Sequence, residues 1–173
     1  MRVTRKYLIW TIIITVLTIA INAYIVMHSC LDATASGGAS KGVVDILENI
    51  INTITPNTIT ESNYDAFTSF VRKAFGHFGL FVVSGLFTSL ATYLWCNPIK
   101  GSKYWMLIAI SLEFGLLMGI ITETIQLNVP GRSGEFTDIL IDFSGYLLGF
   151  LIIFLIIFLI IKKHNKKHQT ATD

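Results

Sequence analysis

Four long apolar blocks, separated by polar segments, dominate the pattern of the chain. They run over residues 7–27, 74–95, 104–127 and 136–161. A helix that crosses a membrane needs about 20 predominantly apolar residues, and each block reaches that length. The pattern therefore predicts an all-α membrane protein with four transmembrane helices.

The polar segment between the first two blocks contains a helical pattern of a different kind. From Val43 to Ile54, apolar side chains recur at helical spacing on one side, and polar side chains occupy the other. Such an amphipathic helix lies on a membrane surface or covers the end of a helix bundle. Pro56 ends the pattern. The spacing from Ser62 to Asp65 is like that of a capping box and predicts the start of another helix.

These patterns divide the 173 residues into four parts. The first transmembrane helix occupies 1–28, and a linker with the amphipathic helix at 43–54 occupies 29–70. A core of three transmembrane helices follows at 71–161, and a basic tail follows at 162–173. The composition, 53% hydrophobic and 14% charged, excludes a water-soluble domain, which needs more charge to cover its surface.

The placement of basic residues predicts the orientation. Nine of the thirteen Lys and Arg residues fall at the N-terminus, in the turn at 97–103 and in the tail. Cytoplasmic segments of membrane proteins carry an excess of Lys and Arg. We therefore expect a multi-pass protein of the cell membrane with both termini in the cytoplasm and the amphipathic helix outside the cell. Nine of the eleven acidic residues then lie on the outer side.

Polar side chains gather at the outer ends of three predicted spans. An ionisable group inside a span costs at least ~2.5–3.5 kcal/mol, so it should face the bundle or water. Glu123 and Gln126 are neighbours on one helix face, and so are Asp138 and Asp142. We therefore predict a binding site at the outer face. Its members are Arg72, Lys73, His77, Glu123, Gln126, Arg132, Ser133, Asp138 and Asp142.

Each of these residues also has a purely structural explanation. Asp138 lies near a helix N-terminus, where a negative charge is stabilised by ~0.3–1 kcal/mol whatever its function. Arg132 could pair with Glu123 or with Asp138. The glycines at 145 and 149 continue the stripe of acids and predict a close contact with another helix. The residues from 150 to 161 look like an apolar anchor that faces lipid.

Glu113 stands apart, because it falls in the middle of the third predicted span. At 1.5 Å per residue it lies ~13 Å into the helix. The favoured interpretation is a protonated side chain that hydrogen-bonds a hydroxyl such as that of Ser84 or Thr88. The alternative is a proton relay.

Several motifs together resemble those of the VanZ-like membrane family. They are Arg72-Lys73 with His77-Phe78, Glu123-x-x-Gln126, Pro130-Gly131-Arg132, Asp138, and Gly145-x-x-x-Gly149. The resemblance covers about 72–149. Asp142 departs from the pattern, since the family usually has Asn there, and Glu113 is not part of it.

The resemblance implies a cell-envelope protein of a Gram-positive bacterium. The family's name-giving member accompanies glycopeptide-resistance genes and lowers susceptibility to teicoplanin. Related proteins are linked to tolerance of lipid-bearing glycopeptides. The resemblance thus implies an antibiotic-resistance phenotype without a reaction.

The residues favour a non-enzymatic binder at the outer leaflet. Arg72, Lys73 and Arg132 would hold the anionic headgroup of a phospholipid or of a lipid-linked cell-wall precursor. The acids and Gln126 would orient these cations or contact an amine of the ligand. No cofactor and no nucleic acid are expected as partners. The sequence does not decide whether the protein contacts the drug directly or forms a homodimer through its glycine stripes.

Two alternatives remain. An intramembrane enzyme could act on a lipid or lipid-linked cell-wall substrate, with Asp138 and Asp142 sharing a divalent ion. The lack of an HExxH motif, paired histidines and a cysteine cluster makes this less favoured. A subunit of a proton-coupled transporter would rest on Glu113 and would require an assembly of chains.

Overall fold

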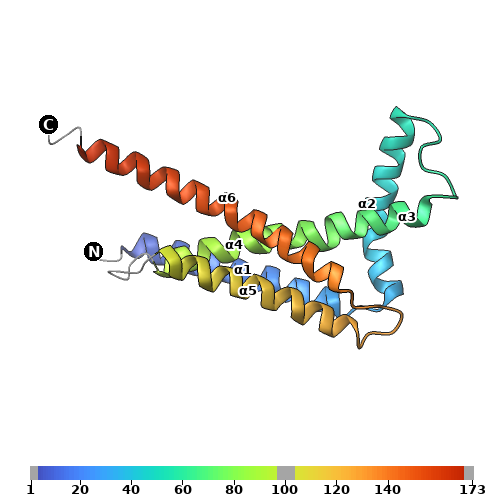
Figure 1. Cartoon of the computed structure of the whole chain (residues 1–173), viewed down its shortest axis with the longest axis horizontal. Coiled ribbons are helices and arrows are strands. Elements are labelled where there is room, and N and C mark those ends of the chain that lie inside the picture. Colours follow the sequence, from blue (N-terminus) through green and yellow to red (C-terminus); the bar gives the residue numbers. More distant parts are fainter. Residues whose placement is uncertain (1–3, 97–103, 170–173) are drawn as a thin grey trace.

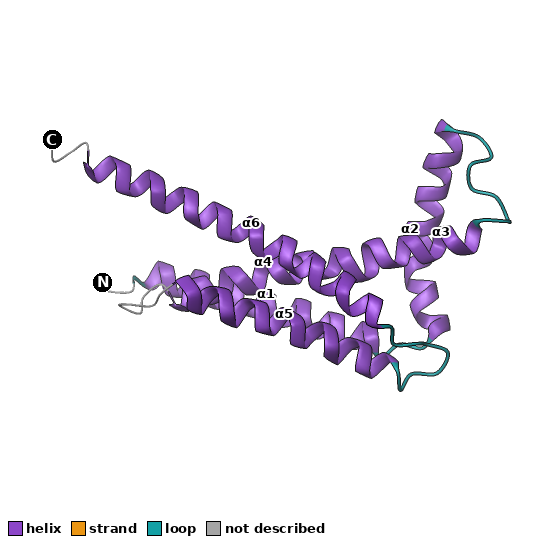
Figure 2. Ribbon diagram, in the orientation of Figure 1, coloured by secondary structure: helices purple, strands orange, loops and turns teal. Residues whose placement is uncertain are grey.

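The computed structural model describes residues 4–96 and 104–169, and all regular elements in these two ranges are helices. Figures 1 and 2 show their arrangement. In chain order they are α1 (Arg5–Ser29), α2 (Ala33–Ile54), α3 (Tyr64–Val71), η1 (Arg72–Gly79), α4 (Leu80–Cys96), α5 (Tyr104–Gln126) and α6 (Phe136–Gln169). Most of the predicted basic turn, 97–103, and the last residues of the tail, 170–173, lie outside the described residues.

Four helical stretches in the described part of the chain are long and apolar enough to span a membrane. They are Arg5–Ser29, Tyr64–Cys96, Trp105–Gln126 and Phe136–Lys163. The predicted multi-pass, all-α membrane architecture is confirmed at this level. The second stretch begins ten residues before the predicted start at 74, because α3, η1 and α4 follow one another without a break.

The amphipathic helix α2 is also longer than predicted. It begins at Ala33 because the Asp32 side chain caps it, accepting a hydrogen bond of 2.8 Å from the backbone N–H of Ala35. The residues from 33 to 42 carry no apolar stripe, so the helix predicted from hydrophobic periodicity did not contain them. The side chain of Val44 is buried, whereas the apolar residues Ile46, Ile50 and Ile54 are exposed.

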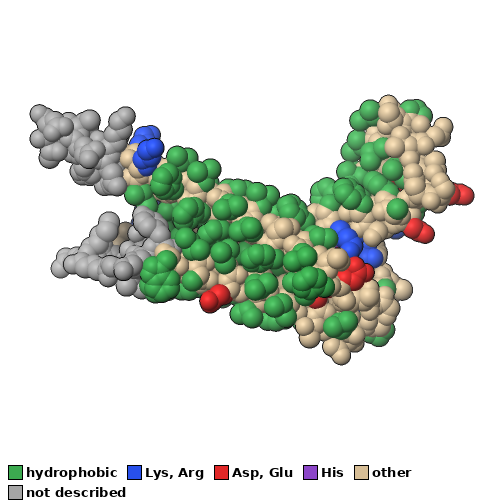
Figure 3. All heavy atoms as spheres, viewed as in Figure 1, with side chains coloured by type: hydrophobic (Ala, Val, Ile, Leu, Met, Phe, Trp, Pro, Cys, Tyr) green, Lys and Arg blue, Asp and Glu red, His purple; other side chains and the backbone are tan. Residues whose placement is uncertain are grey.

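Figure 1 shows α1, α4 and α5 side by side, with α6 crossing α4. Both chain ends lie at one end of this bundle, while α2, α3 and the α5–α6 loop lie at the other, which we call the site end (Figure 1). Apolar side chains cover the bundle, and charged groups gather near its junction with α2 and α3 (Figure 3). The last turns of α6 splay away and expose Leu155, Phe158 and Ile160, as expected of a lipid-facing anchor, although Phe150 and Ile157 are buried.

Glycines of α6 set its close approach to η1 and to α4. A Cβ atom at Gly145 would overlap the carbonyl oxygen of Phe78, and one at Gly149 would overlap the carbonyl oxygen of Val82. The predicted glycine contact is therefore made within the chain. Beside it, the fully buried side chain of Tyr146 fills the space that Gly115 leaves open.

A buried polar network lies between α1 and α4, in the middle of the bundle. The Ser84 hydroxyl donates to Oδ1 of Asn22 at 2.8 Å, and Nδ2 of Asn22 donates to the hydroxyl of Thr88 at 3.4 Å. The expected partnership of these hydroxyls with Glu113 is therefore wrong. The side chain of Glu113 is exposed on the flank of α5, because its position on the helix turns it away from α4.

Candidate functional site

Helix η1 brings three of the predicted cations and bases to the site end. It is a π-helix, whose hydrogen bonds run from residue i to residue i+5 and so widen the turn. Arg72 and His77 would lie about 140° apart on an α-helix of 3.6 residues per turn. The wider turn brings them nearer to one face, and both side chains line the same two cavities.

The loop between α5 and α6 supplies Arg132 and is anchored by a buried acid. Glu123 is 2% exposed, and its Oε2 accepts a hydrogen bond of 3.1 Å from the backbone N–H of Glu135. Gly131 has a φ of 73°, a conformation that side chains with a Cβ rarely adopt. The turn is also tied to α2, since the N–H of Ala33 donates to the carbonyl of Pro130 at 3.4 Å.

A chain of hydrogen bonds connects Glu123 to Arg132 through an amide. Nε2 of Gln126 donates to Oε1 of Glu123 at 2.8 Å, and Nη2 of Arg132 donates to Oε1 of Gln126 at 2.6 Å. The direct ion pair of Arg132 with Glu123 or Asp138, considered from the sequence, is therefore not formed. Gln126 separates the two charges, and this gives the E-x-x-Q spacing a physical reason.

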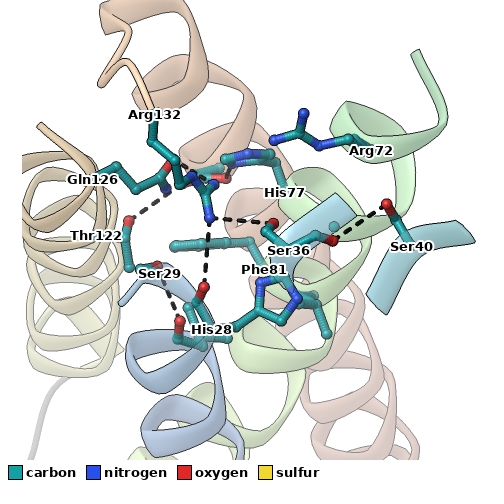
Figure 4. Close-up of a pocket in the computed structure, with 14 residues that line it drawn as sticks. His28, Ser29, Ser36, Ser40, Arg72, His77, Phe81, Thr122, Gln126 and Arg132 are labelled. Carbon is teal, nitrogen blue, oxygen red and sulfur yellow. Dashed lines mark hydrogen bonds and ion pairs between the residues drawn. The ribbon is translucent and has the colours of Figure 1, made fainter. Parts of the chain in front are cut away.

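The remaining contacts of Arg132 are also to uncharged acceptors. Nη1 donates to Oγ of Ser36 at 3.3 Å and to the carbonyl of His28 at 3.5 Å (Figure 4). Burial and the positive charge of Arg72 lower the pKa of Arg132 from its ordinary value. The guanidinium is thus desolvated and close to a second cation, without a carboxylate partner.

Arg72 faces the same space. Its guanidinium makes no hydrogen bond or ion pair with the described residues, and Figure 4 shows it on the same side of the pocket as His77 and Arg132. Both arginines line a cavity of about 140 Å³. The share of one water in the liquid is ≈ 30 Å³, so the cavity has room for a few waters or for one small anionic group.

The carboxylates at the site end are held by other groups. Nζ of Lys73 lies 2.5 Å from Oδ1 of Asp138 and 3.1 Å from Oε2 of Glu135. The hydrogen bond from Lys73 lowers the pKa of Glu135 from its ordinary value. Nδ1 of His77 lies 3.0 Å from Oδ1 of Asp142, which is fully buried.

His77 has two further acidic neighbours. Its Nδ1 lies 3.8 Å from Oε1 of Glu123, and its Nε2 lies 3.9 Å from Oδ2 of Asp138. The site therefore has two halves. One half is cationic and consists of Arg72 and Arg132, and the other contains Lys73 and His77 among the acids.

All nine residues predicted for the site lie at this end of the bundle. Ser133 is at the rim, where its hydroxyl donates to Oε1 of Glu135 at 3.5 Å. The sharing of a metal ion by Asp138 and Asp142, considered only for the alternative of an enzyme, is not favoured by their contacts. Asp138 is bound by Lys73, whereas Asp142 is grouped with His77 and Glu123.

Sequence reasoning missed the residues that α1 and α2 contribute. His28, Ser36 and Ser40 line the cavity beside the two arginines. A usable signal was present for α2, since Asp32, Ser36 and Ser40 recur at intervals of four and so share one face of a helix. No comparable signal marked His28.

One of three comparisons with known proteins gave a match. The family model described as VanZ/LLP1 matches residues 8–159. A comparison with curated proteins and one with solved structures gave no match. The family match spans all four apolar helical stretches and every residue of the site, so the chain belongs to the VanZ/LLP1 family of membrane proteins.

Proposed function

We propose that this protein binds the anionic headgroup of a membrane lipid or of a lipid-linked cell-wall precursor, and thereby lowers susceptibility to lipid-bearing glycopeptides such as teicoplanin. One observation carries the proposal. The guanidinium groups of Arg72 and Arg132 line one cavity, and neither has a carboxylate partner among the described residues.

The distribution of charge supports an anionic ligand. Lys73 holds two of the acids, Glu135 and Asp138. Asp142 is held by His77, and both oxygens of Glu123 accept hydrogen bonds. The charges of the two arginines are therefore left without a counterion, and for Arg132, which is partly buried, this is unfavourable.

A phosphate or carboxylate headgroup is the ligand that suits this pocket. A guanidinium presents paired N–H donors that match the oxygens of such groups, and these charge-assisted bonds are about twice as strong as neutral ones. The side chain of Ser133 offers an additional polar contact in this cavity, and the hydroxyl of Ser36 offers one in a smaller cavity of about 40 Å³ that the same two arginines line. Glu123 and Gln126 act as positioning residues, because they hold Arg132 through hydrogen bonds.

Lys73 has a different role from the one expected from the sequence. Its ammonium is bound to Asp138 and Glu135, so its charge is not available to a ligand. In the proposed function it neutralises the acids that would otherwise repel an anion from the cavity.

The excess of Lys and Arg at the opposite end of the bundle supports placing the site at the outer leaflet, with both termini in the cytoplasm. Teicoplanin-type drugs carry a lipid tail and gain affinity from anchoring in the membrane. A protein that sequesters anionic headgroups at that surface would weaken this anchoring or shield the precursor. Family membership supports this link to drug susceptibility.

The test measures teicoplanin susceptibility in a Gram-positive host that expresses the wild type, Arg72→Gln or Arg132→Gln. Lys41→Gln is the matched control, because Lys41 is an exposed cation outside both cavities. Membrane levels are compared by immunoblot. We expect tolerance from the wild type and the control, and loss of tolerance in both arginine variants.

A binding measurement separates headgroup recognition from other causes. The purified protein in nanodiscs of zwitterionic lipid is titrated with a short-chain anionic phospholipid. Loss of two charge-assisted contacts should weaken binding by at least tenfold in Arg72→Gln plus Arg132→Gln. Tolerance and binding that are unchanged in well-inserted arginine variants would refute the proposal.

A further inference from the structure

We infer that His77, Glu123 and Asp142 form a site for one divalent transition-metal ion, Mn²⁺ or Zn²⁺. The three residues come from η1, α5 and α6. Each offers one ligand atom, and these atoms all lie within 4.8 Å of one another. The site differs from the pair of aspartates that the sequence indicated, and it does not depend on the proposed headgroup binding.

The spacing of the ligand atoms suits a metal ion of this size. With metal–ligand bonds of about 2.1 Å, neighbouring ligand atoms lie roughly 3.0–3.4 Å apart in octahedral or tetrahedral geometry. Nδ1 of His77 is 3.0 Å from Oδ1 of Asp142 and 3.8 Å from Oε1 of Glu123. The three ligand atoms lie within 4.8 Å of one another, so the Glu123 carboxylate would have to shift by about 1 Å toward the other two to reach this spacing.

Without a bound cation, this cluster has an excess of negative charge. Glu123 is 2% exposed and Asp142 is fully buried. Lys73 forms ion pairs with Asp138 and Glu135, and Arg132 is linked to Glu123 only by hydrogen bonds through Gln126. Two buried carboxylates thus share one imidazole, and a divalent ion would neutralise both while His77 serves as a neutral ligand.

Hydrogen bonds around the three residues resemble the outer shell of a metal site. Gln126 and the N–H of Glu135 donate to the two oxygens of Glu123. The hydroxyl of Thr122 lies 3.5 Å from the second oxygen of Asp142. Such partners fix the orientation of ligating carboxylates.

The donor set selects among metals. One imidazole nitrogen disfavours Ca²⁺ and Mg²⁺, which prefer oxygen ligands throughout. Two carboxylates disfavour the soft Cu⁺ ion. Three protein ligands leave at least one coordination position open. His77 lines both cavities and is seen between the cationic side chains in Figure 4, so an open position would face the space beside Arg72 and Arg132.

The experiment titrates Mn²⁺ into the chelator-treated full-length protein in detergent. Free Mn²⁺ is followed by its electron paramagnetic resonance signal, and Zn²⁺ is tested by competition and by elemental analysis of the dialysed protein. The variants are His77→Ala, Glu123→Gln and Asp142→Asn. Asp138→Asn is the matched control, because it removes a neighbouring carboxylate and keeps all three proposed ligands.

We expect one equivalent of metal in the wild type and in Asp138→Asn. Loss of an outer-shell partner alone costs 10–100-fold in affinity, so loss of a ligand should cost at least about 100-fold. Thermal unfolding of each metal-free variant verifies that it is folded, and added metal should raise the unfolding temperature of the wild type but not of Asp142→Asn.

Two results would overturn the inference. One is a folded wild type that binds neither Mn²⁺ nor Zn²⁺ even when the metal concentration is well above the protein concentration. The other is equal affinity in the wild type and in a folded Asp142→Asn variant. Arg72→Gln plus Arg132→Gln serves to separate the two proposals, because it should weaken headgroup binding by at least tenfold and leave Mn²⁺ binding intact.

Discussion

The close contact of η1 and α6 gives a prediction whose size follows from the structure. The substitution is Gly145→Ala. A Cβ atom there would lie 3.0 Å from the carbonyl carbon of Phe78 and 3.1 Å from its Cα, besides overlapping the carbonyl oxygen. The obstacle is backbone, so it cannot rotate away as a side chain could.

The cost can be worked out from these distances. Carbon atoms prefer a separation of ≈ 3.5–4.0 Å, so α6 would have to move away by roughly 0.5–1 Å. A gap of that size forfeits a quarter to a half of the dispersion energy of the contacts that it opens. Overpacking of this kind costs about 1–3 kcal/mol, against a gain of ≈ 0.8–1.0 kcal/mol from the better helix propensity of alanine.

The assay is thermal unfolding of the purified protein in detergent. The net cost is then up to about 2 kcal/mol, and at 2–4 °C per kcal/mol for a chain of this size we expect Gly145→Ala to lower the unfolding temperature by up to about 8 °C. Because Phe78 follows His77, the displacement should also lengthen the 3.0 Å contact of His77 with Asp142. Gly119→Ala is the control, since a Cβ there meets its neighbours at 3.6–3.7 Å, which is ordinary contact.

The control should leave the unfolding temperature unchanged or raise it. If Gly145→Ala were as stable as Gly119→Ala, η1 and α6 would not approach each other as closely as described. The reasoning about glycine packing would then be refuted, and the position of His77 opposite Asp142 would lose its structural support.

Two further predictions concern individual acids. Lys73 lowers the pKa of Glu135, so this pair stabilises the protein above the ordinary Glu pKa of about 4.3, and the stabilisation is lost as the pH falls through the lowered value. The difference in unfolding temperature between the wild type and Glu135→Gln should therefore be positive at pH 6 and shrink toward pH 3, and a difference independent of pH would contradict it. Glu113 is exposed on the flank of a membrane-spanning stretch, so Glu113→Gln should keep or raise stability and leave drug tolerance unchanged. Loss of tolerance in a well-inserted Glu113→Gln protein would instead favour the proton-coupled transporter.

The sequence by itself determined the number and approximate place of the spanning helices. An apolar run of about 20 residues has few stable alternatives, because in lipid every backbone polar group must be bonded within the segment. The motifs from Arg72 to Gly149 likewise indicated the family that the comparison confirms. Their glycines predicted a close helix contact, which the structure contains between α4 and α6.

Only the tertiary structure decided where α2 and the second span begin. Hydrophobic periodicity marks the buried or lipid-facing side of a helix and does not mark turns without such a side. The first turns of α2 are formed by small polar residues behind the Asp32 cap. A π-helix such as η1 leaves no recognised mark in the sequence, yet it brings Arg72 and His77 nearer to one face.

The partners of the charged residues also required the tertiary structure. The candidate site combines basic side chains with acids and amides, and spacing along the chain allows many pairings among them. Packing of η1 against α6 assigned Lys73 to Asp138, and the turn of the α5–α6 loop assigned Arg132 to Gln126. Which groups pair depends on their distance and burial in the folded protein. Lys73 and Asp138, for example, are 65 residues apart in the chain. These are properties of the folded bundle, and they decide which cations remain free to bind a ligand.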